Sequence, residues 1–293
     1  MKKLLVIGGL GNIGYHFLKK IERKTGYSIS CVARSSDKNR KKSKKLKNIN
    51  FIWADIVKEN IDAQLLDSDI IVYLAAILPP NSETKSNQSM IVNCGFVSHM
   101  LETVSSSTKI IFISTSGVKF YKTKSKSPLF AKNYLMQKKQ AELILQKKSE
   151  NYIIIRLPFV FEEKFPQINS KLFQIPLDNK MEFIDIDDVV ENIYSALSTD
   201  TRIINLGGNP ECQIRYKDYI SFCFAGNTGN KKSLFSKEVY PTDWVKGPSI
   251  QQKISFKKMI LKTQLRHPLI YFYRKILRKW NIKKWEKTSP FKY

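Results

Sequence analysis

The stretch Leu4–Gly14 reads LLVIGGLGNIG, so a short apolar run leads through a glycine-rich turn into the start of a helical pattern. Glycines at 8, 11 and 14 suit a turn whose backbone approaches a pyrophosphate closely and whose helix N-terminus points at it. The stretch therefore predicts a dinucleotide site that contains Gly8, Gly11, Asn12, Ile13 and Gly14. The alternative is a tight strand-to-helix turn that needs glycine for its geometry alone.

Short apolar runs and helical patterns alternate through the first half of the chain. The predicted strands are Lys3–Ile7, Ile29–Ala33, Ile49–Trp53, Ile70–Leu74, Lys109–Ser114 and Tyr152–Leu157. The predicted helices between them are Ile13–Lys24, Met90–Val104 and Phe130–Lys148. This alternation is typical of the α/β class and predicts a doubly wound, Rossmann-type parallel sheet.

Beyond Leu157 the pattern loosens, and prolines separate shorter elements. We expect a dinucleotide-binding Rossmann domain over residues 1–157 and a smaller C-terminal substrate lobe over 158–252. Within that lobe a strand near 202–206 is expected to return to the main sheet. Residues 253–293 form a basic amphipathic tail, with thirteen basic residues against one acid.

The overall charge is strongly positive, with 50 Lys+Arg against 25 Asp+Glu and a formal net charge of +25. Such an excess indicates attraction to a phosphorylated cofactor or substrate, a membrane surface or nucleic acid, although a compositional bias toward lysine explains part of it. The four cysteines are scattered, so we expect no metal site, no disulfide framework and a cytoplasmic location. No stretch has the roughly 18 apolar residues of a membrane-spanning helix.

Arg34 follows the second predicted strand, at the position that reports on the dinucleotide. An acid there would bind the ribose hydroxyls of NAD, whereas a guanidinium can pair with a 2′-phosphate. We therefore expect NADP(H) to be favoured over NAD(H). The alternative is a solvated arginine, since the neighbouring run 38–45 is also basic and is interpreted first as a solvated face.

Tyr134 and Lys138 are spaced i, i+4 and so share one helical face. A lysine ammonium beside a phenol favours the phenolate, so the pair predicts a tyrosine that acts as acid and base near neutral pH. Thr115 and Ser116 follow the fifth strand, on the sheet edge where doubly wound folds bind ligands. The hypothesis is that Thr115, Tyr134 and Lys138 are catalytic and that Ser116 and Tyr134 contact the substrate.

With these residues placed, residues 3–210 resemble the extended short-chain dehydrogenase/reductase family, in its nucleotide-sugar epimerase/dehydratase/reductase branch. The segment 69–76 (DIIVYLAA) resembles the family's fourth strand, and 114–118 (STSGV) and 134–142 (YLMQKKQAE) resemble its two catalytic segments. The segments 156–161, 183–189 and 205–208 also resemble family motifs, in the correct order. The resemblance implies cofactor contacts by Asp55, Ile56, Leu74, Ala75, Ala76, Asn93, Lys138 and Leu157, with Asn93 supporting the lysine.

The resemblance implies an NAD(P)-dependent oxidoreductase that acts at C4 of a nucleotide-activated or lipid-linked sugar. Our main expectation is 4-keto-sugar reduction in surface polysaccharide biosynthesis; the alternatives are a sugar 4-epimerase and a non-catalytic dinucleotide sensor. Thr115-Ser116-Gly117 stands where the resembled dehydratases carry Thr-Asp-Glu, which disfavours 4,6-dehydration. In such proteins the helices at the positions of 90–104 and 130–148 often form a dimer face, so the resemblance also implies a homodimer.

The tail segment 268–285 carries apolar and aromatic residues near helical spacing, with lysine and arginine between them. This composition is typical of a helix that lies in the interface of an anionic membrane, which would make the protein peripheral on the inner face of the membrane. A helix docked on its own domain and a helix that binds a partner protein are the alternatives. No nucleic-acid-binding module is recognised, so we expect no nucleic-acid partner.

Overall fold

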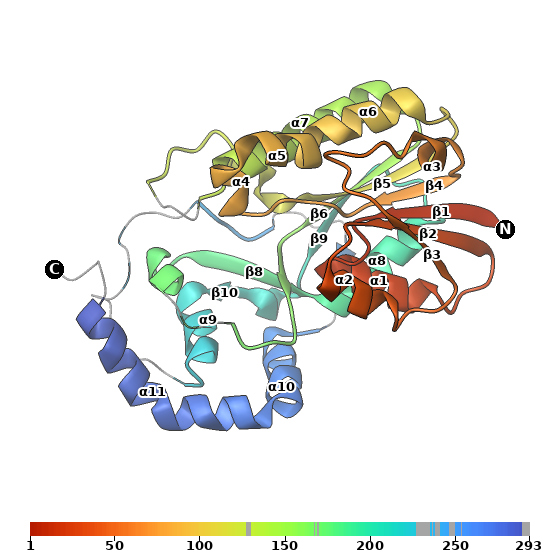
Figure 1. Ribbon diagram of the computed structural model, residues 1–293. Coiled ribbons are helices and arrows are strands. Elements are labelled where there is room, and N and C mark those ends of the chain that lie inside the picture. The colour runs from red at the N-terminus through yellow and green to blue at the C-terminus, as the bar shows by residue number, and fades with distance from the viewer. Residues whose placement is uncertain are drawn as a thin grey trace. The chain divides into compact units, whose positions relative to one another are not determined.

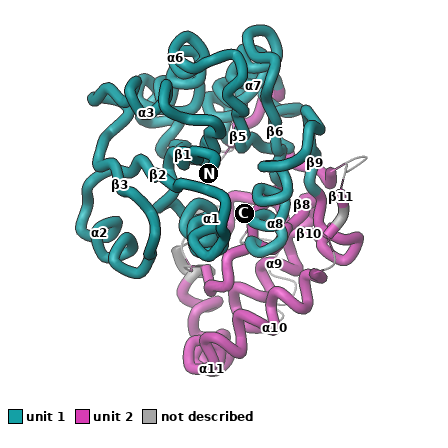
Figure 2. Tube along the Cα trace, turned by 90° about the vertical axis from the view of Figure 1, so that its right-hand side faces the viewer, with its two compact units in different colours: residues 1–122, 131–157, 186–206 teal, residues 123–130, 158–185, 207–293 magenta. Residues whose placement is uncertain are grey.

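A computed structural model of the chain describes residues 1–126, 130–166, 168, 170–226, 235, 237, 241–245, 250–252 and 254–288. The chain divides into two compact units, coloured separately in Figure 2. Unit 1 contains residues 1–122, 131–157 and 186–206, and unit 2 contains residues 123–130, 158–185 and 207–293.

Unit 1 is built on a parallel sheet whose strands run in the order β9-β6-β5-β4-β1-β2-β3. The order reverses between β1 and β4, as a doubly wound sheet requires, so the predicted fold class is confirmed. The strand bounds are β1 Lys2–Ile7, β2 Tyr27–Ala33, β3 Ile49–Trp53, β4 Ile70–Tyr73, β5 Lys109–Thr115, β6 Tyr152–Leu157 and β9 Ile203–Gly207.

Helices cover both faces of this sheet (Figure 1). One face carries α3 (Asp62–Leu66), α4 (Asn81–Thr84), α5 (Ser86–Met90), α6 (Phe96–Thr103) and α7 (Lys132–Lys148). The other carries α1 (Asn12–Ile21), α2 (Asp37–Ser43) and α8 (Ile186–Ala196). On the first face a continuous core joins strand residues such as Ile7, Tyr73 and Phe112 to Met100 of α6 and Leu145 of α7.

Gly8 lies where β1 leaves the sheet and has a positive φ of 83°, a conformation that glycine adopts without strain. A Cβ atom at Gly8 would also lie 2.7 Å from the backbone nitrogen of Ala75, which follows β4. At Gly14 a Cβ would lie 2.6 Å from Cα of Gly9, because the first turn of α1 packs directly on the turn after β1. Backbone therefore approaches backbone around this turn, and the turn requires glycine at both positions for its geometry.

The predicted helix over Met90–Val104 is interrupted in the structure. A π-helical turn, η1 (Ile91–Gly95), joins α5 to α6. π-Helical turns are rare and often occur at functional sites, and this one places Asn93 in the interior with no exposed surface. Part of the basic run 38–45 forms helix α2, which is capped by the Ser36 side chain and has no buried residue, so the run is a solvated face as expected.

Unit 2 has a small sheet in the order β10-β8-β7, in which β8 (Lys180–Asp185) runs parallel to β7 (Phe159–Phe161) and antiparallel to β10 (Gln213–Arg215). An aromatic core that includes Phe161, Phe183 and Phe222 packs around it. The other elements are η3 (Ser170–Gln174), η4 (Pro210–Cys212), α9 (Tyr216–Cys223), β11 (Ile250–Gln251), α10 (Phe256–Arg266) and α11 (Pro268–Thr288).

Replacing Gly14 by alanine tests whether the turn after β1 tolerates any side chain. We expect Gly14→Ala to lower the free energy of unfolding by ~1–3 kcal/mol and to abolish dinucleotide binding, because the new methyl group meets backbone that cannot move aside. Gly95→Ala is the matched control. Its Cβ would lie 3.7 Å from the nearest atom, so we expect stability within ~1 kcal/mol of wild type. Chemical denaturation measures both, and equal effects would contradict this account.

Candidate active site

The predicted site residues of unit 1 gather at the carboxyl edge of the parallel sheet. They follow or end six different strands, and parallel strands end at the same edge of a sheet. The residues are Gly8 after β1, Arg34 after β2, Asp55 and Ile56 after β3, Leu74, Ala75 and Ala76 after β4, Thr115 and Ser116 at the end of β5, and Leu157 at the end of β6.

The turn after β1 fits the pyrophosphate of a dinucleotide. Helix α1 begins at Asn12, after Gly11, and has no acidic residue in its first turn. The N–H groups of Asn12 and Ile13 lie in that first turn, where an α-helix leaves its donors without intrahelical partners. Backbone donors, the positive end of the helix dipole and the absence of a side chain at Gly11 together suit a bound phosphate.

Basic and aromatic groups surround the end of β2. Arg34 is exposed, and Asn39 of α2 donates a hydrogen bond to its carbonyl oxygen (2.8 Å). The guanidinium of Arg40 stacks 3.9 Å above the ring of Trp53, which ends β3. Lys42 donates a 2.7 Å hydrogen bond to the carbonyl oxygen of Leu10, inside the glycine-rich turn. No local sequence pattern indicates this contact of Lys42, because it depends on how α2 packs against the glycine-rich turn.

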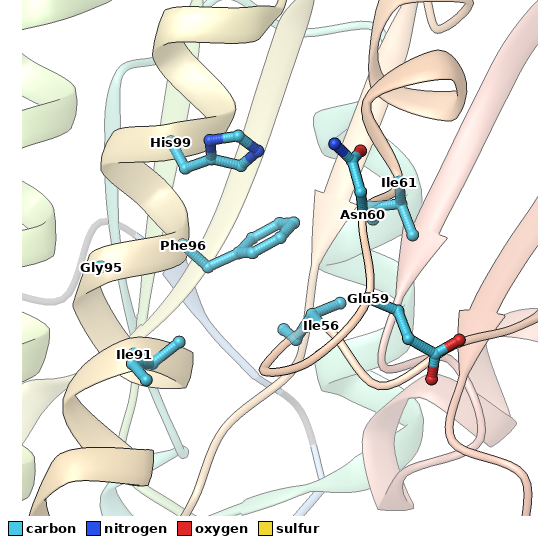
Figure 3. Close-up of a pocket in the computed structure, with 8 residues that line it drawn as sticks. All are labelled: Ile56, Glu59, Asn60, Ile61, Ile91, Gly95, Phe96 and His99. Carbon is cyan, nitrogen blue, oxygen red and sulfur yellow. The ribbon is translucent and has the colours of Figure 1, made fainter.

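A cavity of about 280 Å³ lies where the segment after β3 faces η1 and α6 (Figure 3). Ile56, Ile61 and Phe96 supply its apolar wall, and His99 lies at its border. His99 forms a 2.7 Å contact with Asp62, and this hydrogen bond lowers the pKa of the Asp62 carboxyl. Asp55 itself accepts a hydrogen bond from the Val57 N–H, which holds the segment in a turn beside the cavity.

Asn93 joins the segment after β4 to helix α7. Its amide group exchanges two hydrogen bonds with the backbone of Ile77 (2.9 and 3.0 Å) and donates a third to Gln137 (2.8 Å). Gln137 in turn donates to Ser89 of α5. Gln137 stands next to Lys138 in α7, so Asn93 contacts the helix directly beside the lysine that it is expected to support.

Glu142 forms a buried ion pair that ties α7 to two strands. Its side chain is completely buried, and Arg156 of β6 donates two hydrogen bonds to it, at 2.9 and 2.7 Å. Ser114 of β5 adds a third at 2.6 Å. Because every bond is directional, these contacts set the position of α7 along and across the sheet. Glu142 belongs to the segment that carries Tyr134 and Lys138.

The N-terminus of α7 is capped by a residue distant in sequence. Ala131 stands at the N-cap position and has no polar side chain, while Glu83 of α4 accepts hydrogen bonds from the N–H groups of Asn133 (3.0 Å) and Tyr134 (3.2 Å). A carboxylate at this position satisfies free donors and complements the helix dipole. Glu83 therefore orients the turn that carries Tyr134, although no local capping pattern points to it.

Lys138 is buried, with 2% of its surface exposed. Its ammonium group donates a 2.8 Å hydrogen bond to the Ile113 carbonyl oxygen of β5 and lies 4.4 Å from the centre of the Phe112 ring. Burial lowers the pKa of Lys138 to about 7, while the negative charge of Glu142 acts in the opposite direction. Lys138 therefore exchanges its proton near neutral pH.

Tyr134 lies one helical turn before Lys138 on α7. Burial raises the pKa of its phenol above the ordinary value, and in the chain alone the expected lowering by Lys138 is not seen. The physical reason is that desolvation disfavours both the phenolate and the ammonium. Thr115 accepts a hydrogen bond from the Gly117 N–H (3.1 Å), and Gly117 packs against Leu135. The Thr115–Ser116 segment therefore lies beside the first turn of α7.

Comparison with known proteins identifies the family of the chain. The sequence profile of the "NAD dependent epimerase/dehydratase family" matches residues 4–207, and the chain belongs to this family. It is an enzyme of the extended short-chain dehydrogenase/reductase type. Comparison of the sequence with curated proteins returns no match.

Several solved structures share the fold. A UDP-glucuronic acid 4-epimerase from Bacillus cereus in complex with UDP-glucuronic acid and NAD is 21% identical, with 94% of this chain and 99% of that chain covered and a TM-score of 0.60. The UDP-Glc/GlcNAc 4-epimerase from Campylobacter jejuni is 17% identical (91% and 98% covered, TM-score 0.65). A UDP-N-acetylglucosamine 4-epimerase from Methanobrevibacter ruminantium M1, in complex with UDP-N-acetylmuramic acid, is 20% identical (93% and 98% covered, TM-score 0.61).

The lowered pKa of Lys138 predicts a specific dependence of stability on pH. Between pH 7 and about pH 10.5 the unfolded chain binds the lysine proton and the folded chain releases it, so the free energy of unfolding rises with pH. Lys138 can raise the free energy of unfolding by at most ~1.4 kcal/mol per pH unit. We expect Lys138→Met to remove it.

Urea denaturation of wild type and Lys138→Met at pH 7, 8 and 9 measures this difference. We expect the free energy of unfolding of wild type to increase relative to that of Lys138→Met at each step from pH 7 to pH 9. Lys139→Met, one residue further along α7 and more exposed, is the control and should follow wild type at every pH. A pH-independent difference between Lys138→Met and wild type would contradict the lowered pKa.

Proposed function

We propose that this enzyme epimerises C4 of a UDP-activated sugar with a nicotinamide dinucleotide as its cofactor. The observation that carries the proposal is the placement of Tyr134 and buried Lys138 on α7, beside Thr115 at the carboxyl edge of the sheet. The 4-epimerases named above, which cover nearly the whole chain, support epimerisation over the reduction that we expected first.

In this proposal Tyr134 removes the proton from the sugar O4 hydroxyl and later returns it. Thr115 and Ser116 donate hydrogen bonds to the same oxygen and so orient the C4–H bond toward the cofactor. Lys138 supplies the positive charge that favours the phenolate and can also hold a ribose hydroxyl of the cofactor. When bound, a nicotinamide dinucleotide would supply reversible hydride transfer at C4, which inverts that carbon if the two transfers use opposite faces of the sugar.

The cofactor is held, in our proposal, by the glycine-rich turn and by the segments that follow β3 and β4. Gly8 and Gly14 let the backbone around this turn pack closely, Gly11 adds no side chain, and the first-turn N–H groups of α1 would bind the pyrophosphate. Asp55 and Ile56 would contact the adenine, and Leu74, Ala75, Ala76 and Leu157 would contact other parts of the dinucleotide. Asn93 contributes through the Ile77 segment that it holds in place.

Reduction of a 4-keto sugar by NADPH is the second candidate. It is favoured by Arg34, whose exposed guanidinium follows β2, and by the Arg40 and Lys42 contacts beside it. These positive groups suit a 2′-phosphate, and the same residues Thr115, Tyr134 and Lys138 would serve either reaction. The setting we propose is surface polysaccharide assembly at the cytoplasmic face of a membrane, with a nucleotide-activated or lipid-linked sugar as substrate.

Turnover of UDP-sugars distinguishes the two reactions. The purified protein is incubated with UDP-glucose, UDP-N-acetylglucosamine or UDP-glucuronic acid and substoichiometric NAD⁺ or NADP⁺, and the products are separated by anion-exchange chromatography. An epimerase interconverts the C4 isomers without net change in the dinucleotide. Stoichiometric consumption of NADPH with a UDP-4-keto sugar, and no interconversion, would instead establish the reductase.

Tyr134→Phe removes the proposed acid–base group and changes the shape of the site little. We expect kcat to fall by roughly 10²–10⁴, because the O4 proton loses its acceptor, with dinucleotide affinity unchanged. Tyr194→Phe on α8 is the matched control and should retain wild-type kcat. Full activity of Tyr134→Phe would exclude the proposed role of Tyr134.

Arg34→Ala tests the cofactor preference. If Arg34 binds the 2′-phosphate, the loss of a charge-assisted pair should weaken NADPH binding by roughly 10- to 100-fold and leave NADH binding unchanged. Arg23→Ala, an exposed arginine after α1, is the control. Isothermal titration calorimetry measures each affinity, and equal wild-type affinities for NADPH and NADH would show that Arg34 does not select the cofactor.

A further inference from the structure

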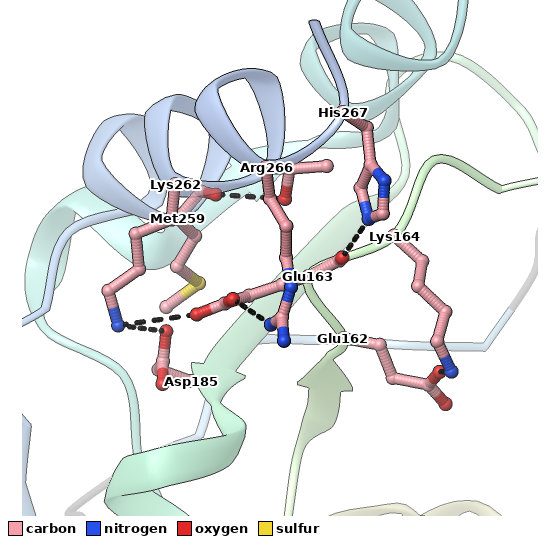
Figure 4. Close-up of polar contacts among 9 residues, drawn as sticks. Glu162, Glu163, Lys164, Asp185, Met259, Lys262, Arg266 and His267 are labelled. Carbon is pink, nitrogen blue, oxygen red and sulfur yellow. Dashed lines mark hydrogen bonds and ion pairs between the residues drawn. The ribbon is translucent and has the colours of Figure 1, made fainter. Parts of the chain in front are cut away.

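Helices α10 and α11 belong to unit 2, and specific polar contacts anchor them to the rest of that unit. Lys262 of α10 lies 3.4 Å from buried Asp185 at the end of β8 and 3.6 Å from Glu163 after β7 (Figure 4). Arg266 pairs with the same Glu163, and His267 contacts its backbone carbonyl at 3.1 Å. The first part of the basic tail is therefore an integral part of unit 2.

One face of α11 also packs on the rest of unit 2. Arg274 donates hydrogen bonds to the carbonyl oxygens of Cys223 (2.7 Å) and Pro166 (2.6 Å), and Tyr271 stacks on Phe165 with ring centroids 6.2 Å apart. Further along the helix Ile282 packs against the aromatic core. These contacts set the rotation of α11 about its own axis, and so determine which residues point away from unit 2.

The opposite face of α11 is a row of large apolar side chains, which we call the apolar stripe. Its members follow the spacing i, i+3, i+4, i+7, i+11, so they share one side of the helix. All are exposed: Leu269 (82%), Phe272 (63%), Tyr273 (63%), Ile276 (62%) and Trp280 (58%). Apolar surface of this extent along one helix indicates an interaction site.

Positive charge borders the apolar stripe. Lys275, Lys279 and Lys283 are exposed on α11 next to it. Residues 256–288, which form the two helices, contain eleven basic residues and one acid, Glu286. A surface that combines apolar side chains, including tryptophan and tyrosine, with a dense positive border complements an apolar phase under a layer of negative charge.

The positive charge beside the apolar stripe favours an anionic bilayer over a second copy of the chain as its binding partner. In a symmetric pair of α11 helices the same lysine-rich borders would face each other, and like charges would oppose the contact. An anionic bilayer instead places phosphates against the lysines and acyl chains against Leu269, Phe272 and Ile276. Among the residues that the structure describes, no helix is long and apolar enough to cross a membrane, so contact would be along the surface.

We propose that α11 binds the enzyme to an anionic phospholipid surface, with the apolar stripe inserted at the level of the headgroups. The helix lies in the plane of the membrane and its lysines contact lipid phosphates. Unit 2 remains folded on the other face of α11, held by Arg274 and Tyr271. The enzyme would then work within reach of lipid-linked sugars or of membrane enzymes that use its product.

Vesicle co-sedimentation of the full-length protein tests this proposal. Vesicles of phosphatidylcholine alone are compared with vesicles that contain phosphatidylglycerol. We expect binding to the anionic vesicles, weakened by salt, and a loss of at least tenfold in partitioning for Phe272→Ser/Trp280→Ser, since both side chains enter the interface. Lys275→Gln/Lys279→Gln should lose roughly fivefold per lysine.

Matched variants on unit 1 control for surface composition. Leu66→Ser replaces a leucine that is 63% exposed, and Lys58→Gln/Lys147→Gln removes two exposed lysines. Each should bind vesicles like wild type. Circular dichroism confirms that all variants fold, so a loss of binding is not a loss of structure.

Two outcomes would overturn the proposal. One is binding that the stripe variants share equally with the controls, since the basic surface alone would then suffice. The other is no vesicle binding, together with a dimer in size-exclusion chromatography that Phe272→Ser/Trp280→Ser converts to a monomer, which would assign the stripe to a second copy of the chain. Neither outcome depends on the proposed enzymatic activity, because the assay measures partitioning alone.

Discussion

The arrangement of the candidate active site depends on one buried carboxylate. Glu142 has no solvent contact and is held by Arg156 of β6 and Ser114 of β5. A buried charge without such partners would cost several kcal/mol, so α7 cannot shift along the sheet without breaking these bonds. Glu142 is one turn from Lys138, which is one turn from Tyr134. The ion pair therefore places both proposed catalytic side chains relative to the end of β5.

The same carboxylate also acts on the charge of Lys138. Burial alone favours the neutral amine, and the negative charge of Glu142 opposes this effect, so the pKa of Lys138 is about 7. Tyr134 is shifted in the opposite direction, since burial disfavours its phenolate. A bound, positively charged nicotinamide would lower the pKa of a nearby phenol. The site is thus suited to acid–base work chiefly once its cofactor is present.

Much of the fold could be predicted from local patterns. The strands at 49–53 and 152–157 match the structure residue for residue, because each is a short, mostly apolar or aromatic run between turn residues. The helix over 90–104 was predicted as continuous, whereas the structure contains a π-helical turn around Asn93. Periodicity cannot reveal that turn, since its position follows from the Ile77 and Gln137 contacts of Asn93, two partners far apart in the sequence.

The sequence by itself determined the doubly wound class, the glycine-rich turn, and the positions of Thr115, Tyr134 and Lys138 along the chain, because these depend on periodicity and on residue spacing within one element. Only the tertiary structure decided that Glu83 caps α7, that Lys42 reaches the Leu10 carbonyl, and which face of α11 stays exposed. Each of these depends on side chains brought together from distant segments by the packing of the core, and no local pattern encodes such a meeting.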